Sequence, residues 1–216
     1  MHLMQTTIRD QRKYSFIRML VTGVCLTFSA VQTALAADWQ IDPSQTHFHF
    51  KTRGLIQTEG SFSRFSGAIK GDVFDPAHLE LTFTIQADSA STGSSMTDGM
   101  LKGSSFFNVE KYPEMTFKTT QITQVDPAHS KVRGELTMVG ITKPIEFKVN
   151  LSTPLVDPIT HTVTIKTSTS FLLDRNQWGM SSYGSFVNKN IEVQVDSAMV
   201  SNNVDPEVIA KLTEKP

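Results

Sequence analysis

The sequence predicts an all-β fold, an antiparallel β-barrel of about eight strands, and three observations support that prediction. Apolar and polar residues alternate over most of the chain, which is the period of a strand with one buried face. Turn-forming residues separate the alternating runs, and only two short segments depart from the pattern. Strands joined by short turns form antiparallel sheets, and a twisted sheet of this size usually closes and so removes its edges. A β-sandwich is the alternative, but long strands and local connections favour the barrel.

Each expected strand is a run of this alternation between turn residues. The clearest runs are Leu79–Ala87, Pro144–Ser152, His161–Leu173 and Asn190–Val200, and weaker ones are Thr46–Lys51, Phe65–Val73, Glu114–Thr120 and Val132–Val139. Two Asp-Pro turns, in Phe74–His78 and Val125–His129, separate strands, because proline sets the φ angle that a turn needs. The segment Val139–Pro144 is short enough to be the turn of a hairpin.

Two segments are predicted not to be strands. Residues 95–107 contain Ser95 three positions before Asp98, a spacing that resembles a capping box and predicts a short helical connector. At the C-terminus, Asp205 before Pro206 predicts the start of a short helix or a frayed tail. We therefore expect a domain of residues 37–200 and a C-terminal tail or short helix of residues 201–216.

Residues 1–36 have the pattern of a secretory signal peptide. A basic segment precedes the apolar run Met19–Val31, and Ala34-Leu35-Ala36 follows as a cleavage site. The run is shorter than the roughly 20 residues that span a bilayer, so we expect a cleaved leader rather than an uncleaved anchor helix. No later run approaches transmembrane length, so we expect no stable membrane insertion after cleavage.

Composition excludes several classes of function. The one cysteine, Cys25, lies in the leader, so the expected mature chain has no thiol for a disulfide, a metal site or a nucleophile. The net charge is −1 and no basic patch interleaved with aromatic residues occurs, so nucleic acid is not an expected partner. His47 and His49 have the spacing of a chelating pair, but Phe48 and Phe50 define the inner face and place both histidines outside. No catalytic motif occurs, so we expect no catalytic residue, no metal site and no enzyme.

The residues predicted to face the inside of the barrel mix phenylalanines with glycines, threonines and serines. A barrel of about eight strands is either filled by its own side chains or holds one small ligand. Small residues between aromatic ones leave room for an elongated apolar guest, although they also permit strands to bend. A cavity lined by carbon atoms would take a lipid-like ligand.

Three segments resemble the YceI-like family of lipid- and polyisoprenoid-binding proteins. They are "TRGLIQTEGSFSRFSGAI", "SSFFNVEKYPEMTFKTT" and "GELTMVGITKPIEFKV", and the late "DRNQWGM" adds to the match, which covers Trp39 to about Val200. The resemblance implies an extended, lipocalin-like antiparallel barrel, a lumen that holds an isoprenoid or another long amphiphile, and export to the periplasm. The alternation already places Phe48, Phe50, Phe83, Phe117, Phe147 and Phe171 on the inner face. Together with the resemblance it gives the expected ligand-binding residues, namely Phe48, Phe50, Phe65, Phe83, Asp98, Met100, Leu101, Lys102, Phe106, Phe107, Met115, Phe117, Met138, Phe147, Phe171, Arg175 and Trp178, with Asp98 and Lys102 near the mouth. Trp178 fits equally well as a plug at the barrel end.

The chain departs from the family pattern before the Phe-Phe pair. Many members have arginine, histidine and arginine where this chain has Thr97, Met100 and Lys102. Lysine lacks the bidentate fork of arginine, so the resemblance implies a weaker grip on an anionic head group and favours a neutral one, such as a quinone or an amide.

The sequence thus predicts a periplasmic protein that binds, sequesters or transports one amphiphilic lipid and needs no other cofactor. The alternative is a structural or stress-related interaction module with a self-filled barrel. Exposed edge strands would also be compatible with a homodimer.

Overall fold

The structure is a computed structural model that describes residues 37–55 and 57–213. The chain divides into two units, residues 1–34 and 35–216, and the described residues belong to the second unit. The predicted leader, residues 1–36, lies outside the described residues.

The described residues form one antiparallel sheet of twelve strands, as predicted for an all-β chain. The strands are β1 (Gln40–Ile41), β2 (His47–Gly54), β3 (Thr58–Phe62), β4 (Phe65–Lys70), β5 (Glu80–Gln86), β6 (Ala90–Ser91), β7 (Glu114–Asp126), β8 (His129–Met138), β9 (Ile141–Leu151), β10 (Leu155–Val156), β11 (Val163–Asp174) and β12 (Val187–Ser201). The helices are α1 (Ser95–Lys102) and α2 (Pro206–Thr213), with 3-10 turns η1 (Pro43–Gln45), η2 (Pro76–His78), η3 (Ala87–Ser89) and η4 (Arg175–Trp178). None of the helices within the described ranges is long and apolar enough to cross a membrane.

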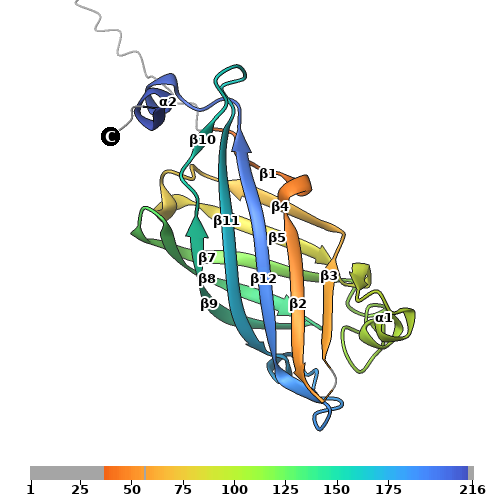
Figure 1. Ribbon diagram of the computed structural model, residues 1–216. Helices are drawn as coiled ribbons and strands as arrows, with labels where there is room; N and C mark the ends of the chain where they lie inside the picture. The colour runs from red at the N-terminus through yellow and green to blue at the C-terminus, as the bar shows by residue number, and fades with distance from the viewer. Residues whose placement is uncertain (1–36, 56, 214–216) are drawn as a thin grey trace, which may run out of the picture. The chain divides into compact units, whose positions relative to one another are not determined.

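The sheet is strongly curled, so that its two halves face each other across an interior space. Its hydrogen-bonded order is β4-β5-β7-β8-β9-β11-β12-β2-β3-β6, with β1 paired to β12 and β10 paired to β11. In Figure 1, β11, β12 and β2 form the near wall, and β5, β7 and β8 cross behind them at a steep angle. The N-terminal strand β2 pairs with the C-terminal strand β12, so the two ends of the domain meet within one wall.

The predicted closed barrel of eight strands is wrong in its strand number and in its closure. The path contains ten strands, and its end strands β4 and β6 are not paired with each other. The short strands β1, β6 and β10 have two residues each, and two residues are too few to show a period. Strand β3 was also missed, because "TEGSF" is too rich in polar and small residues to alternate clearly.

Aromatic rings connect the β4 end of the sheet to β2, with which β4 has no backbone pairing. The ring of Phe48 on β2 lies 5.0 Å from the ring of Phe65 on β4 and 5.4 Å from that of Phe83 on β5. A Cβ atom added to Gly67 on β4 would lie 2.7 Å from Ile41 Cγ1 on β1, so these two strands are also in close contact. Side-chain packing therefore brings β4 and β5 against β1 and β2, and we call this line of contact the aromatic seam.

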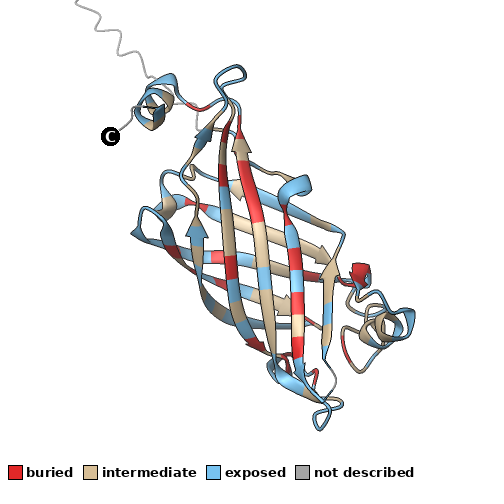
Figure 2. Ribbon diagram, viewed as in Figure 1, coloured by how far each residue is buried: buried red, intermediate tan, exposed pale blue. Residues whose placement is uncertain are grey.

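Burial follows the predicted two-residue period along the long strands. On β11, Val163, Ile165, Thr169 and Leu173 are buried, and the residues between them are more exposed. Figure 2 shows the same alternation along β2 and β11. The predicted hairpin is also present: Met138 pairs with Ile141, and the two turn residues between them have positive φ angles, as a type I′ turn requires.

Both predicted helices are present, with a correction to the start of α1. The N-cap is Ser94, whose hydroxyl accepts a hydrogen bond from the Thr97 backbone N–H at 3.4 Å. The capping box was predicted one residue later, at Ser95 and Asp98, but the Asp98 carboxylate instead faces back toward Thr92. Helix α1 is also shorter than the predicted connector, because turns follow Lys102.

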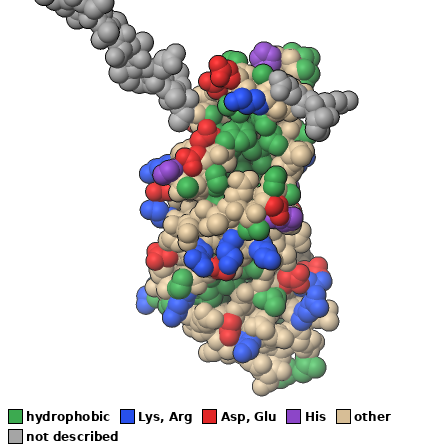
Figure 3. Space-filling view, turned by 90° about the vertical axis from the view of Figure 1, so that its left-hand side faces the viewer, with side chains coloured by type: hydrophobic (Ala, Val, Ile, Leu, Met, Phe, Trp, Pro, Cys, Tyr) green, Lys and Arg blue, Asp and Glu red, His purple; other side chains and the backbone are tan. Residues whose placement is uncertain are grey.

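Helix α2 lies at the opposite end of the domain from α1 (Figure 1). Its apolar residues Val208, Ile209 and Leu212 pack against a cluster that includes Trp39 and Val163. Its N-terminus is capped as predicted, since the Asp205 carboxylate accepts a hydrogen bond from the Glu207 N–H at 2.7 Å. The outer surface carries both acidic and basic side chains. On the face seen in Figure 3, hydrophobic side chains also gather in one area.

Candidate functional site: an apolar cavity inside the curled sheet

The curled sheet encloses a cavity of about 490 Å³ that is lined almost entirely by apolar side chains. This volume lies within the range of 300 to 1,000 Å³ that is usual for small-molecule sites. The structure brings most of the predicted ligand-binding residues together around it, namely Phe48, Phe50, Phe83, Met100, Leu101, Phe106, Phe107, Met115, Phe117, Met138, Phe147, Phe171 and Arg175. A single apolar space therefore runs between the two walls of the sheet.

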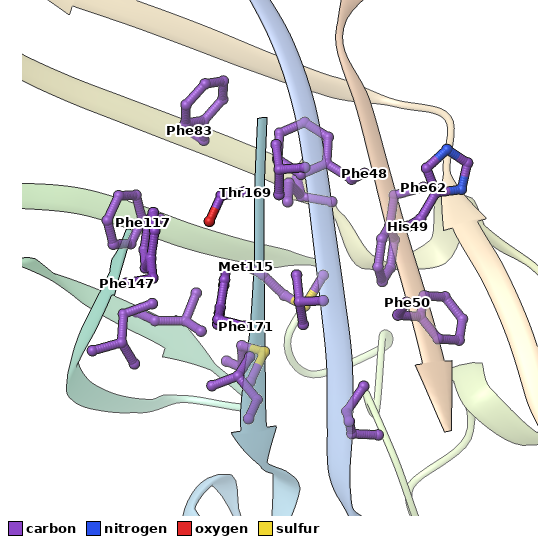
Figure 4. A pocket seen from close by; sticks show the side chains of 18 of the residues that line it. Phe48, His49, Phe50, Phe62, Phe83, Met115, Phe117, Phe147, Thr169 and Phe171 are labelled. Atoms are coloured by element: carbon purple, nitrogen blue, oxygen red, sulfur yellow. The ribbon is translucent and has the colours of Figure 1, made fainter. Parts of the chain in front are cut away.

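Aromatic rings from different strands form much of the lining (Figure 4). The rings of Phe147 on β9 and Phe171 on β11 are stacked with centroids 4.6 Å apart, and Phe117 on β7 lies 5.5 Å from Phe147. These three side chains are only half-buried although they face inward. Inward-facing rings that stay half-exposed border open space, as expected for a lumen that the protein's own side chains do not fill.

The glycines of the inner faces do not provide this space, contrary to the expectation from composition. A Cβ atom on Gly134 of β8 would lie 2.5 Å from two carbons of the Phe117 ring, and one on Gly60 of β3 would lie 2.5 Å from Phe50 Cζ. These glycines let the aromatic rings lie flat against the neighbouring strand. The small residues that do border the cavity carry hydroxyl groups, and they include Thr52, Thr167, Thr169 and Ser197.

Helix α1 and the segment after it cover one end of the cavity. Met96, Thr97, Met100 and Leu101 of the helix line it, together with Phe106 and Phe107. The Phe107 ring packs on Phe62 with centroids 5.6 Å apart, which ties the segment to β3. The helical connector predicted from the sequence thus lies at one end of the cavity, which we call the mouth.

Two predicted ligand-binding residues, Asp98 and Lys102, lie in α1 but do not line the cavity. The Asp98 carboxylate accepts hydrogen bonds from the Thr92 backbone N–H and the Thr92 hydroxyl, both at 2.7 Å, and from the Ser91 hydroxyl at 3.3 Å. The Thr92 hydroxyl, followed by the Thr92 N–H, holds the pKa of Asp98 below its ordinary value. Asp98 is therefore placed to anchor the start of α1.

Phe65 and Trp178 also lie outside the lining. Phe65 belongs to the aromatic seam through its contact with Phe48. Trp178 in η4 is only 1% exposed, and its indole N–H donates to the Leu136 carbonyl oxygen at 3.1 Å. This placement matches the alternative in which Trp178 plugs the barrel end.

Arg175 is the buried cation of this site. It is 1% exposed, and its guanidinium donates to three backbone carbonyls, those of Asn188 and Val187 at 3.2 Å each and that of Met180. Burial lowers the pKa of Arg175, and the neighbouring charge of Asp174 opposes that effect. The guanidinium carbon lies 5.8 Å from the centroid of the Phe106 ring, within reach of a cation–π contact.

Most hydroxyl groups around the lumen are used by the protein itself. The Thr169 hydroxyl donates to the Lys148 carbonyl at 2.6 Å, and the hydroxyls of Thr46 and Ser197 lie 2.9 Å apart. Thr52 differs, because its Oγ1 is buried and has no hydrogen-bond partner within the described ranges. Buried polar atoms are nearly always paired, so Thr52 marks a place where a partner is expected.

The histidine pair does not form a metal site with its surroundings. His47 and His49 are both exposed, with ring centroids 6.3 Å apart. The alternation predicted both outside the barrel, but His49 also borders the cavity (Figure 4). In the part of the chain that the structure describes, no three His, Cys, Asp or Glu side chains gather closely enough to hold a metal ion.

Several lining residues were not predicted. Val193 and Val195 on β12 and Ile85 on β5 line the cavity. The two-residue period could have identified Ile85, which shares a face with Phe83, whereas Val193 and Val195 are placed by their pairing with Phe50 and Phe48. The two-residue period of β2 likewise places Thr52 on the same face as Phe48 and Phe50. Met180 and Tyr183 come from an irregular segment, for which the sequence carries no periodic signal.

Comparison with other proteins places the fold in a known group. The solved structure of BcnA from Burkholderia cenocepacia is similar with a TM-score of 0.66 and 20% identity, covering 74% of this chain and 99% of that one. A solved polyisoprenoid-binding domain from Saccharophagus degradans is similar with a TM-score of 0.58 and 13% identity, covering 76% of this chain and 99% of that one. At these identities the likeness is one of fold.

The sequence comparisons point the same way. A UPF0312 protein of Yersinia pestis (strain Pestoides F) is 34% identical over 130 residues, which are 58% of this chain and 67% of the relative. A UPF0312 protein of Pectobacterium carotovorum is 33% identical over 135 residues, 61% of this chain and 69% of the relative. The model of the YceI-like domain matches residues 39–199, and the chain therefore belongs to the YceI-like family.

Proposed function

We propose that this chain is a periplasmic binding protein that holds one long amphiphilic lipid inside the curled sheet, to sequester or transport it. The observation that carries the proposal is the cavity of about 490 Å³ with its apolar lining. An apolar cavity excludes water and binds apolar molecules, so the apolar chain of a lipid is the guest that fits. Membership of the YceI-like family and the likeness in fold to a structure described as a polyisoprenoid-binding domain support the same class of ligand.

The arrangement favours binding without catalysis and without a further cofactor. The lining contains aromatic and aliphatic side chains from both walls and few titratable groups, which suits an apolar chain but offers few groups for proton transfer. The leader predicted in residues 1–36 directs the protein to the periplasm in this proposal. A cavity of this size argues against the alternative of a structural module whose barrel is filled by its own side chains.

The test is to express the full chain with its leader, purify the protein from the periplasm without detergent and extract it with organic solvent. Mass spectrometry of the extract is expected to find one lipid at about one molecule per protein. Delipidated protein should melt at a lower temperature, because a ligand that binds only the native state stabilises it by mass action. A clean extract from a protein that melts unchanged would overturn the proposal in favour of the self-filled module.

A further inference from the structure

One end of the cavity differs in polarity from the rest. Thr52 on β2 pairs with Ile191 on β12, which pairs with Leu173 on β11, so these residues lie at one level of the near wall. Arg175 follows Leu173 by two residues, and both Arg175 and Thr52 line the cavity. Strand β11 leads to Arg175, and its backbone lies two strand spacings, about 10 Å, from the backbone of Thr52 on β2.

Arg175 retains hydrogen-bonding capacity that the protein does not use. A guanidinium has five N–H donors, and three of them are bonded to the carbonyls of Asn188, Met180 and Val187. Two N–H groups thus have no acceptor within the described residues. No Asp or Glu side chain in the described ranges forms an ion pair with this cation; Asp174, its neighbour in sequence, pairs with Lys189 at 3.7 Å.

The charge of Arg175 is also unmatched within the cavity. Among the lining residues it is the single Lys, Arg, Asp or Glu side chain. A buried charge without a partner is destabilising, and three neutral carbonyls solvate the guanidinium without balancing its charge. Thr52 adds a second buried donor without a partner, 5% exposed, at the same end.

We propose that Arg175 and Thr52 bind the head group of the lipid, and that this head group is an anion, a carboxylate or a phosphate. Its oxygens would accept hydrogen bonds from the free N–H groups of Arg175 and from the Thr52 hydroxyl, and its charge would balance the guanidinium. The apolar chain would then extend away from Arg175, past Phe171 and Phe147. This inference rests on the proposed function, because it assigns the polar end of the same ligand.

The inference opposes the expectation of a neutral head group, which rested on Thr97, Met100 and Lys102. Thr97 and Met100 belong to α1 at the mouth and border the cavity there. Met100 lines the rim of the cavity and is 45% exposed, and Lys102 does not line it. The residues that differ from the family pattern therefore lie at or outside the mouth. The buried cation of the site is Arg175, and it keeps the planar fork that matches carboxylates and phosphates.

The test uses two pairs of probes on the delipidated full-length protein: oleic acid with oleyl alcohol, and geranylgeranyl phosphate with geranylgeraniol. Each anion is expected to bind at least roughly tenfold more tightly than its alcohol, as charge-assisted hydrogen bonds would give. A preference in only the first pair identifies a fatty acid, and one in only the second a prenyl phosphate. Equal affinities within both pairs would overturn the inference and leave the proposed function intact, whereas failure of all four probes to bind would overturn the proposed function.

Two substitutions assign the preference to these residues. Thr52→Val is expected to reduce the affinity for the preferred anion about tenfold while the protein stays folded, since it removes only an unpaired hydroxyl. Thr164→Val on β11 is the matched control, because it makes the same change of side chain at a position that does not line the cavity. Arg175→Gln should abolish the difference between anion and alcohol, with binding of the alcohol as the check on folding. An anion preference that survives both Thr52→Val and Arg175→Gln would place the head group elsewhere.

Discussion

The Phe117 ring and Gly134 show how single residues set the packing of the inner faces. Gly134 on β8 pairs with Thr119 on β7, and the ring of Phe117, two residues earlier, lies over the glycine. A Cβ atom at position 134 would come within 2.5 Å of two ring carbons and of the Lys118 carbonyl oxygen. The position therefore excludes even a methyl group for steric reasons.

We expect Gly134→Ala to destabilise the fold by about 1–3 kcal/mol, the usual effect of overpacking. Urea denaturation followed by tryptophan fluorescence would measure the change. Gly99→Ala is the matched control, because a Cβ atom there has no neighbour within 4 Å and alanine favours helix α1 by about 1 kcal/mol over glycine. Opposite signs for the two variants are expected; an unchanged or raised stability for Gly134→Ala would contradict this account of the packing.

Residue-level prediction from the sequence succeeded where a side chain lies on a regular strand. Phe83 and Phe147 were identified as lining residues because their strands alternate without interruption. The sequence could not show which of Trp178 and Arg175 lines the cavity, because both belong to η4, where the two-residue period of a strand does not apply. Only the fold shows that one side chain is bonded away from the cavity and the other lines it.

At the scale of elements, α1 is held at its start by one carboxylate. Asp98 binds the N–H and hydroxyl of Thr92, which connects the helix back to the segment after β6. The pKa of Asp98 is lowered from its ordinary value of 3.8, first by the hydrogen bond from the Thr92 hydroxyl. A carboxyl whose pKa is lowered by folding stabilises the folded state above its unfolded pKa, and that contribution is lost as the pH falls through the lower, folded value.

We therefore expect the anchor of α1 to be intact above pH 4 and to be lost below pH 3.8. The amide resonance of Thr92 in a pH titration by NMR should report it, because this N–H is bonded to the titrating group. Its midpoint is expected below 3.8. In Asp98→Asn the same resonance should not titrate in this range, and a wild-type midpoint at or above 3.8 would rule out the proposed anchor.

The elements also show which signals the sequence carries. The hairpin of β8 and β9 was predictable because its turn is short and both strands alternate. The start of α1 was misplaced by one residue, because Ser94 and Ser95 are both good N-caps and only the direction of the Asp98 side chain separates them. Strand β6 depends on its partner β3 for its definition, and such pairing is not encoded locally.

At the scale of the whole molecule, the open lumen should accept added volume without loss of stability. Val195 on β12 lines the cavity midway along the near wall, between Thr169 on β11 and Phe48 on β2. A larger side chain at this position would extend into open space. It would occupy the volume that a lipid chain needs.

We expect Val195→Trp to lower the amount of co-purified lipid roughly tenfold, an effect of about 1.4 kcal/mol on binding, with the unfolding free energy unchanged or raised. Lipid would be counted by mass spectrometry of solvent extracts. Leu172→Trp on β11 is the control, since Leu172 is 68% exposed on the outer face and should leave the lipid content as in the wild type. Unchanged lipid in Val195→Trp would mean that the cavity is not where the lipid binds.

The aromatic seam determines how the girth of the domain can vary. Along most of the wall, ladders of backbone hydrogen bonds join neighbouring strands and fix their spacing at about 4.8 Å, although β9 and β11 pair over only two residues each. Between β4 and β2 the contacts are made by the rings of Phe48, Phe65 and Phe83, and rings can slide or tilt without breaking a directional bond. A bulky guest would therefore widen the interior along the seam, and the same sheet could adjust to chains of different thickness while the strand pairs with long ladders keep their register.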